Sequence, residues 1–219
     1  MESKSFFLFF IELTAAALMM RLADGWIHRL YEEGRAVLSF PDAVGDRGQW
    51  RKPLLLLIYF GSLWFLSPSF QLPAGMYLVL AAFFLGLATV TDFEQYVIFD
   101  RVLMPFALCG LLAAVHLGAP LADRLLAAAA GGAAFLLLAV LTKGGIGGGD
   151  VKLVAALGLW LGSDRLLMVV TVGLVAGGAA ALLLLLTKKK ERRSFFAYGP
   201  YFALAALWLL LTGGIAAAP

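Results

Sequence analysis

The sequence predicts an all-α, polytopic integral membrane protein with about eight transmembrane helices, one of them short. Of its 219 residues, 62% are hydrophobic and only 14% are charged, whereas a soluble domain is usually about half apolar and a quarter charged. The apolar residues gather in runs separated by short polar breaks. Many of these runs are long enough to cross a bilayer, because about 20 helical residues span its hydrocarbon core of roughly 30 Å.

Eight apolar segments follow one another along the chain, and the second and sixth are the shortest. They comprise residues 6–20, 54–66, 74–90, 102–117, 125–141, 153–161, 166–187 and 195–212. The first begins like a signal peptide, but no small-residue cleavage signal followed by a soluble body comes after it, so we expect it to be the first span. The largest polar segment, residues 22–53, is expected to be a loop, because it mixes both charge signs with Gly and Pro.

The distribution of Lys and Arg predicts the orientation. If the N-terminus lies outside, only Lys4, Arg124 and Arg165 of the 17 basic residues fall outside, and the rest fall inside. Basic residues are enriched in cytoplasmic loops, so we expect both termini outside. Without the short sixth span, the KKKERR cluster would lie outside as well, which favours keeping that span.

Several function classes are disfavoured. The net charge of +3 reports orientation in a membrane protein and gives no reason to expect a nucleic-acid partner. The single cysteine, Cys109, excludes a disulfide framework and a cysteine zinc site. No HExxH motif occurs, and His28 and His116 lie on opposite sides of the predicted topology, so no metal or other cofactor is expected. A pair of Ser62 and His116 is formally possible, although Ser62 is better explained as a small residue at a helix contact.

Ionisable residues near membrane depth are costly and mark functional candidates. The predicted topology puts Asp92 at the inner end of the third span and Asp150 at the inner start of the sixth, at the same depth. Taken singly, each could simply cap a helix. The other candidates are Glu12, Glu94, Asp100, Lys143, Lys152 and, near the outer face, His116.

Two carboxylates that meet in this way have a specific chemistry. They cannot both ionise easily, so they share a proton and titrate as a unit. One can take a proton from water that attacks a peptide carbonyl, while the other donates to the carbonyl oxygen. The neighbouring Gly147, Gly148 and Gly149 lack Cβ atoms and would let a substrate strand approach closely.

Three blocks of sequence resemble the type IV prepilin peptidases, which are aspartic membrane proteases of the GxGD type. "TDFEQYVIFDRVLMP" places Glu94 and Asp100 at the family's usual spacing from Asp92, and "GGIGGGDVKL" contains the GxGD pattern that ends at Asp150. "FFAYGPYFALAALW" is similar to the motif FGPxLALGAL that leads into the last span. The blocks occur in the family's order, and the eight-span arrangement is also similar.

This resemblance implies an endopeptidase that cuts the basic leader from prepilins or pseudopilins, with its active site on the cytoplasmic side of the inner membrane. Asp92 and Asp150 would be catalytic. The substrate would be contacted by Gly147, Gly148, Gly149, Glu94 and Lys152. The expected partners are this substrate and the lipid bilayer, and the sequence leaves the oligomeric state open.

The first part of the chain departs from the family's longer members. Residues 1–73 form a degenerate methyltransferase-like region with two spans and a cytoplasmic loop, and residues 74–219 form the peptidase membrane core. The longer members carry paired CxxC motifs for zinc in this loop, but residues 22–53 contain no cysteine. We therefore expect no zinc, and the sequence leaves open whether any methyltransferase activity is retained. In addition, Phe99 stands where the family usually has proline.

Two other functions stay open from the sequence alone. The degenerate first part suits a non-enzymatic membrane assembly component of a pilus or type II secretion system. Alternatively, the aspartates could carry protons in a transporter, although the inverted repeat that many transporters contain is not visible.

Overall fold

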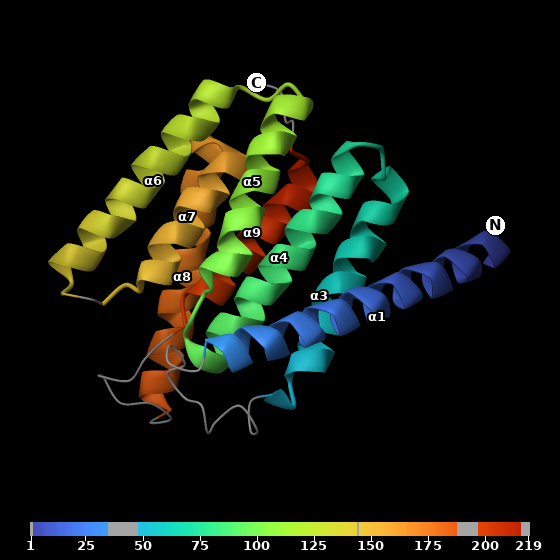
Figure 1. Ribbon diagram of the computed structural model, residues 1–219, viewed down its shortest axis with the longest axis horizontal. Helices are drawn as coiled ribbons and strands as arrows, with labels where there is room; N and C mark the ends of the chain where they lie inside the picture. Colours follow the sequence, from blue (N-terminus) through green and yellow to red (C-terminus); the bar gives the residue numbers. More distant parts are fainter. Residues whose placement is uncertain (1, 35–47, 144, 188–196, 216–219) are drawn as a thin grey trace.

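The computed structural model describes residues 2–34, 48–143, 145–187 and 197–215, which form eight α-helices and one short 3₁₀ helix (Figure 1). They are α1 (Glu2–Glu33), α3 (Arg51–Leu66), η3 (Ser67–Ser69), α4 (Ala74–Gln95), α5 (Asp100–His116), α6 (Leu121–Leu141), α7 (Gly148–Leu161), α8 (Ser163–Leu186) and α9 (Gly199–Gly213). No strand occurs within these described ranges, so the all-α prediction is confirmed there. Helices α1, α4, α6 and α8 are long and apolar enough to cross a membrane, as expected of a multi-pass membrane protein.

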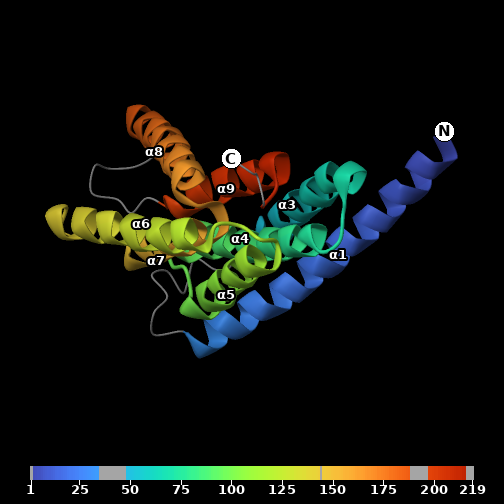
Figure 2. The ribbon, with the colours of Figure 1, turned by 90° about the horizontal axis from the view of Figure 1, so that it is seen from above.

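Helix α4 lies at the centre of the bundle. It packs against α3, α5 and α9, while α7 packs against α5 and α6, and α8 against α9. Helix α1 contacts α3 and α4 and runs obliquely across the bundle on the side away from α8 (Figure 2). Its N-terminal end projects beyond the other helices (Figure 1). Two-thirds of the apolar window of α4 is buried (67%), against 11% for α1, so α1 presents most of its surface to the surroundings.

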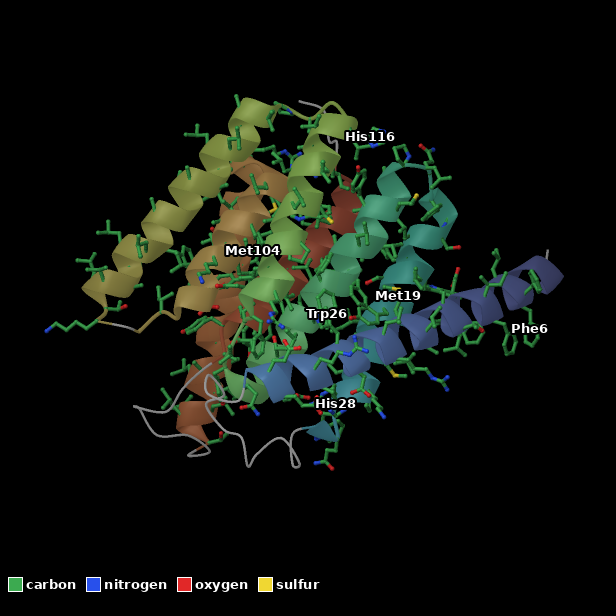
Figure 3. All side chains as sticks on the ribbon, in the orientation of Figure 1. Phe6, Met19, Trp26, His28, Met104 and His116 are labelled. Carbon is green, nitrogen blue, oxygen red and sulfur yellow. The ribbon has the colours of Figure 1, made fainter. Side chains whose placement is uncertain are left out.

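Small residues allow the helices to pack closely. A Cβ atom added to Gly158 of α7 would lie 2.4 Å from the backbone nitrogen of Ala128 in α6, so the two backbones meet where Gly158 has no side chain. This is the usual role of small residues in membrane helices. The outer surface, in contrast, exposes large apolar side chains such as Phe6 (68%) and Met104 (72%), both labelled in Figure 3. Such a surface suits a hydrocarbon environment.

The predicted loop at residues 22–53 is wrong at both ends. Helix α1 continues to Glu33, and α3 already begins at Arg51. The reason is an amphipathic pattern: Ala23, Ile27 and Leu30 are buried at helical spacing, so this charged stretch has an apolar face to bury. Residues 35–47 lie outside the described part of the chain.

Several other predicted segments also begin at different places, and the sixth and eighth matter for the site. The sixth segment was expected from residue 153, but α7 begins at Gly148, so Asp150 belongs to its first turn. The eighth was expected from residue 195, whereas α9 begins at Gly199. The KKKERR cluster and residues 195–196 lie outside the described residues.

Candidate active site

Asp92 and Asp150 line one cavity of about 520 Å³. The cavity lies between the C-terminal end of α1, the junction of α4 with α5, and the N-terminal end of α7. Its lining consists of Leu30, Glu33, Gly34, Asp92, Tyr96, Val97, Ile98, Phe99, Asp100, Arg101, Gly147, Gly148, Gly149, Asp150 and Lys152. The two aspartates are close enough for the charge of Asp150 to act on Asp92. The fold therefore brings together two carboxylates that are distant in sequence.

Asp92 is held by the start of another helix. It lies in the last turn of α4 and is only 6% exposed. Its Oδ2 atom accepts a hydrogen bond of 3.0 Å from the backbone N–H of Gly199, the first residue of α9. The first N–H groups of a helix have no partner within that helix. Asp92 thus supplies a partner to α9 from α4, and the bond fixes the position of its carboxylate.

Gly199 is a residue of this site that the sequence did not single out. A Cβ atom at this position would lie 2.7 Å from Asp92 Oδ2 and 2.9 Å from Ile98 Cδ1. Only glycine lets the backbone approach the carboxylate this closely. The available signal was the "FFAYGPYFALAALW" block, which contains Gly199 but had no assigned part in the site.

Asp150 is the third residue of α7, whose N-cap is Gly147. A carboxylate in the first turn of a helix is stabilised by the helix dipole. Its Oδ2 atom lies beside Gly147, since an added Cβ there would be 3.4 Å away. Its Oδ1 atom is buried and has no hydrogen-bond partner within the described part of the chain. Buried polar atoms are normally paired, so this oxygen is available to a ligand in the cavity.

The glycine run forms an open wall of the cavity. A Cβ atom at Gly148 would meet nothing within 4 Å, and one at Gly149 would lie 3.2 Å from Ile98 Cβ. Gly147 and Gly148 are exposed. The cavity wall that leads to Asp150 therefore presents backbone rather than side chains to an approaching chain.

Ion pairs border the cavity. Lys152 Nζ donates to both carboxylate oxygens of Asp100 at 2.7 Å, and Arg101 pairs with Glu33. All four side chains are more than half exposed, and an exposed pair usually contributes about 0–1 kcal/mol. Lys152, which the sequence grouped with the substrate-binding residues, lines the same cavity as the two aspartates.

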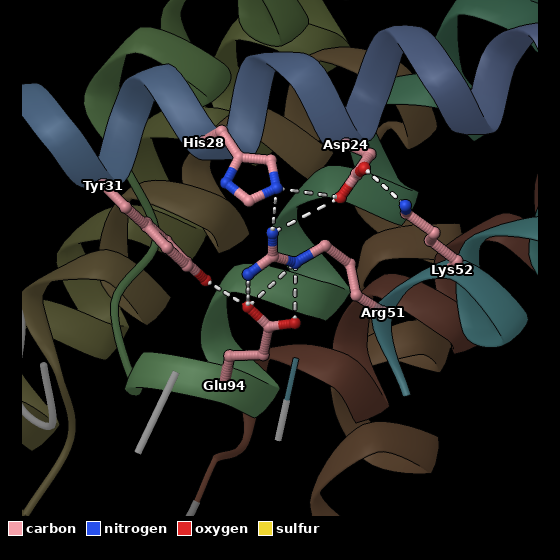
Figure 4. A network of polar contacts seen from close by, with 6 residues as sticks. All are labelled: Asp24, His28, Tyr31, Arg51, Lys52 and Glu94. Carbon is pink, nitrogen blue, oxygen red and sulfur yellow. Dashed lines mark hydrogen bonds and ion pairs between the residues drawn. The ribbon is translucent and has the colours of Figure 1, made fainter. Parts of the chain in front are cut away.

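Glu94 lies outside the cavity, although the sequence grouped it with the substrate-binding residues. Its side chain is fully buried and belongs to a polar network (Figure 4). The other members of this network are Asp24, His28, Tyr31, Arg51 and Lys52. Arg51 donates to Glu94 through Nε (2.9 Å) and Nη2 (2.7 Å), and Tyr31 donates through its hydroxyl at 2.8 Å. Glu94 therefore joins the end of α4 to α1 and α3, two residues after Asp92.

The alternative serine–histidine pair is not assembled. Ser62 donates to the carbonyl of Ile58 at 2.6 Å, and His116 Nδ1 lies 3.2 Å from the Tyr77 hydroxyl. His28 and His116 lie at opposite ends of the bundle (Figure 3). Within the described ranges, no group of three or more His, Cys, Asp or Glu side chains is arranged to hold a metal ion.

Comparison with known proteins agrees with the motifs. The model of the type IV leader peptidase family matches residues 78–182. This stretch contains Asp92 and the glycine run with Asp150, and it ends before Gly199. No curated protein and no solved structure matches the chain.

We expect Gly199→Ala to disturb the site, because the new Cβ would push Asp92 away from its hydrogen-bond donor. Overpacking of this kind costs about 1–3 kcal/mol. Thermal unfolding in detergent should show the loss. Gly61→Ala is the matched control, since a Cβ there meets nothing within 4 Å; equal stability of the two variants would contradict the packing argument.

We also expect Glu94→Ala to lower the free energy of unfolding by about 3–5 kcal/mol, because it leaves the buried Arg51 without its main partner. Glu33→Ala breaks an exposed ion pair and should cost about 1 kcal/mol or less. The comparison is made by denaturant unfolding of both variants. A Glu94 variant as stable as the Glu33 variant would show that the buried network contributes little.

Proposed function

This chain belongs to the type IV leader peptidase family, and we propose that it is a membrane-embedded aspartic endopeptidase that removes the leader peptide from type IV prepilin-like or pseudopilin-like precursors. The observation that carries the proposal is the single cavity that Asp92 and Asp150 line beside a wall of glycines. A shared cavity is what a carboxylate pair needs in order to act on one water and one peptide bond.

The proposed reaction is general acid–base hydrolysis by the two aspartates. One carboxylate takes a proton from a water molecule as that water attacks the scissile carbonyl carbon, and the protonated partner donates to the carbonyl oxygen. The carbon–nitrogen bond then breaks, and the nitrogen leaves with a proton as the new amino terminus. Asp92 has one oxygen committed to Gly199, whereas Oδ1 of Asp150 has no partner within the described residues.

The substrate would lie along the glycine wall in an extended conformation. Gly147, Gly148 and Gly149 let its backbone come close to both carboxylates, and Lys152 lies at the cavity edge. The apolar helix of the precursor would remain in the bilayer beside the exposed apolar surface of the bundle. The leader would remain on the polar side of the cavity.

We further propose eight crossings of the inner membrane, with the site on the cytoplasmic side. The ends of α1, α4 and the starts of α5 and α7 meet at the cavity, and α9 begins beside Asp92. Such an up-and-down alternation is what successive crossings require. The same alternation puts Arg124 and Arg165 at the far end of the bundle. These are two of the three basic residues that the predicted orientation leaves outside, and the other basic residues are then left for the cytoplasmic side, where loops are enriched in Lys and Arg.

We propose that residues 1–73 support the peptidase core, residues 74–219, rather than perform methyl transfer. The buried pair of Arg51 and Glu94 crosses this boundary, and Leu30, Glu33 and Gly34 close one side of the cavity.

Asp92→Asn and Asp150→Asn should each abolish cleavage, because the amide can neither take up nor release the proton. General acid–base catalysis contributes about 10²–10⁴-fold to a rate, so each loss should be at least of this size. The assay follows conversion of a leader-bearing prepilin peptide by the purified full-length protein in detergent. Asp164→Asn is the control, since Asp164 is exposed at the far end of the bundle.

Full cleavage by both variants would contradict the aspartic mechanism. Inactivity of the unaltered protein on several prepilin peptides would instead favour the alternative of a non-enzymatic assembly component of a pilus or type II secretion system.

A further inference from the structure

A second hollow lies beside the candidate site, and nothing in the proposed reaction uses it. Its volume is about 600 Å³, within the range of about 300–1,000 Å³ that is typical of ligand pockets. It lies between α1 and the neighbouring helices α4 and α5. Its lining consists of Arg21, Leu22, Gly25, Trp26, Arg29, Leu30, Glu33, Phe83 and Arg101. We call it the arginine hollow.

The arginine hollow has a cationic wall. Arg21, Gly25 and Arg29 follow one another at spacing i, i+4 and i+8, so they share one face of α1. Gly25, midway between the two arginines on this face, leaves open space, because an added Cβ would meet nothing within 4 Å. Arg101 already pairs with Glu33, the one acidic residue of the lining. Within the described residues, Arg21 and Arg29 have no ion-pair partner.

The floor of the arginine hollow is apolar. Trp26 stacks on Phe83 with ring centroids 6.1 Å apart, and Leu22 is more than half exposed. Trp prefers the membrane–water interface, where one end of the side chain is apolar and the other is wet. Two unpaired arginines above an aromatic floor therefore match a ligand with an anionic head and an apolar tail.

The geometry points to the phosphate headgroup of an anionic membrane lipid as the ligand of the arginine hollow, and we propose this as a binding site distinct from the peptidase cavity. Guanidinium groups bind phosphate through two parallel N–H···O bonds. Most of α1 is exposed, so lipid has direct access to the hollow. A basic leader peptide would be repelled by Arg21 and Arg29, which excludes that part of the substrate as the occupant.

The test uses the full-length protein in neutral detergent, without any peptidase substrate, so its result is separate from the proposed reaction. Thermal unfolding is followed during titration with dioctanoyl phosphatidylglycerol, dioctanoyl phosphatidylcholine or inorganic phosphate. A ligand that binds only the folded state stabilises it by RT ln(1 + [L]/Kd), so the midpoint rises with ligand concentration once this exceeds Kd. We expect phosphatidylglycerol to raise the midpoint in this concentration-dependent way, and the other two probes to have little effect.

Three variants test the site itself. Arg21→Gln and Arg29→Gln should each weaken the apparent affinity for phosphatidylglycerol about fivefold, as expected for one cation at a lipid surface. Gly25→Leu keeps both charges but fills the hollow, and it should weaken binding at least as much. Lys143→Gln removes an exposed charge outside the hollow and should leave the affinity unchanged.

Several results would overturn the proposal. Equal stabilisation by phosphatidylcholine would indicate a groove without charge selectivity, and equal stabilisation by inorganic phosphate would remove the lipid as the source of the anion. Unchanged binding by the two arginine variants and the Gly25 variant would place the lipid elsewhere on the protein.

Discussion

Helix ends impose the main constraint on this fold. The first N–H groups and the last carbonyl groups of a helix have no partner within it, and an apolar surrounding offers none. At the end of the bundle that holds the cavity, Asp92 accepts from the first N–H of α9. At the far end, Arg165 donates to the carbonyl of Gly213, and Arg124 to that of Ile215. In these contacts an acidic side chain accepts from a helix start and basic side chains donate to a helix end, and Asp92 and Asp150 lie where several helix ends meet.

The composition and the apolar periodicity were sufficient to predict an all-α membrane bundle, because each helix must hide its backbone from lipid. The sequence also predicted Asp92, Asp150 and Lys152 on one side of the membrane, since every second polar stretch between apolar runs lies near the same face, and the structure places all three at one cavity. Their meeting in one cavity follows from the alternating direction of the helices. The prediction of a loop failed where a charged stretch carries apolar residues at helical spacing, as in the part of α1 between residues 21 and 33.

Long-range partners were beyond the reach of the sequence. Nothing local marks Arg51 as the partner of Glu94, because the pair joins α3 to α4 across 43 positions. Gly199 illustrates the same difficulty, since its importance is the absence of a Cβ atom beside Asp92, a residue of another helix. Phe99 can be understood from its own backbone, without a distant partner. It stands where the family usually has proline, and its φ of −77° is within the range that proline would impose. The loop before α5 therefore keeps a proline-like backbone without the proline.

The cavity and the arginine hollow share Leu30, Glu33 and Arg101, and the ion pair of Arg101 with Glu33 lies between them. A lipid headgroup in the hollow would hold α1 at a fixed depth, because the phosphate groups of a bilayer lie in one plane. Leu30, Glu33 and Gly34 of the same helix region close the cavity, so its depth would be fixed as well. A peptidase whose substrate is anchored in the bilayer needs this register, since the scissile bond lies at a set distance from the substrate's apolar helix. The depth of the cavity and the depth of the scissile bond would then both be set by the plane of the lipid phosphates.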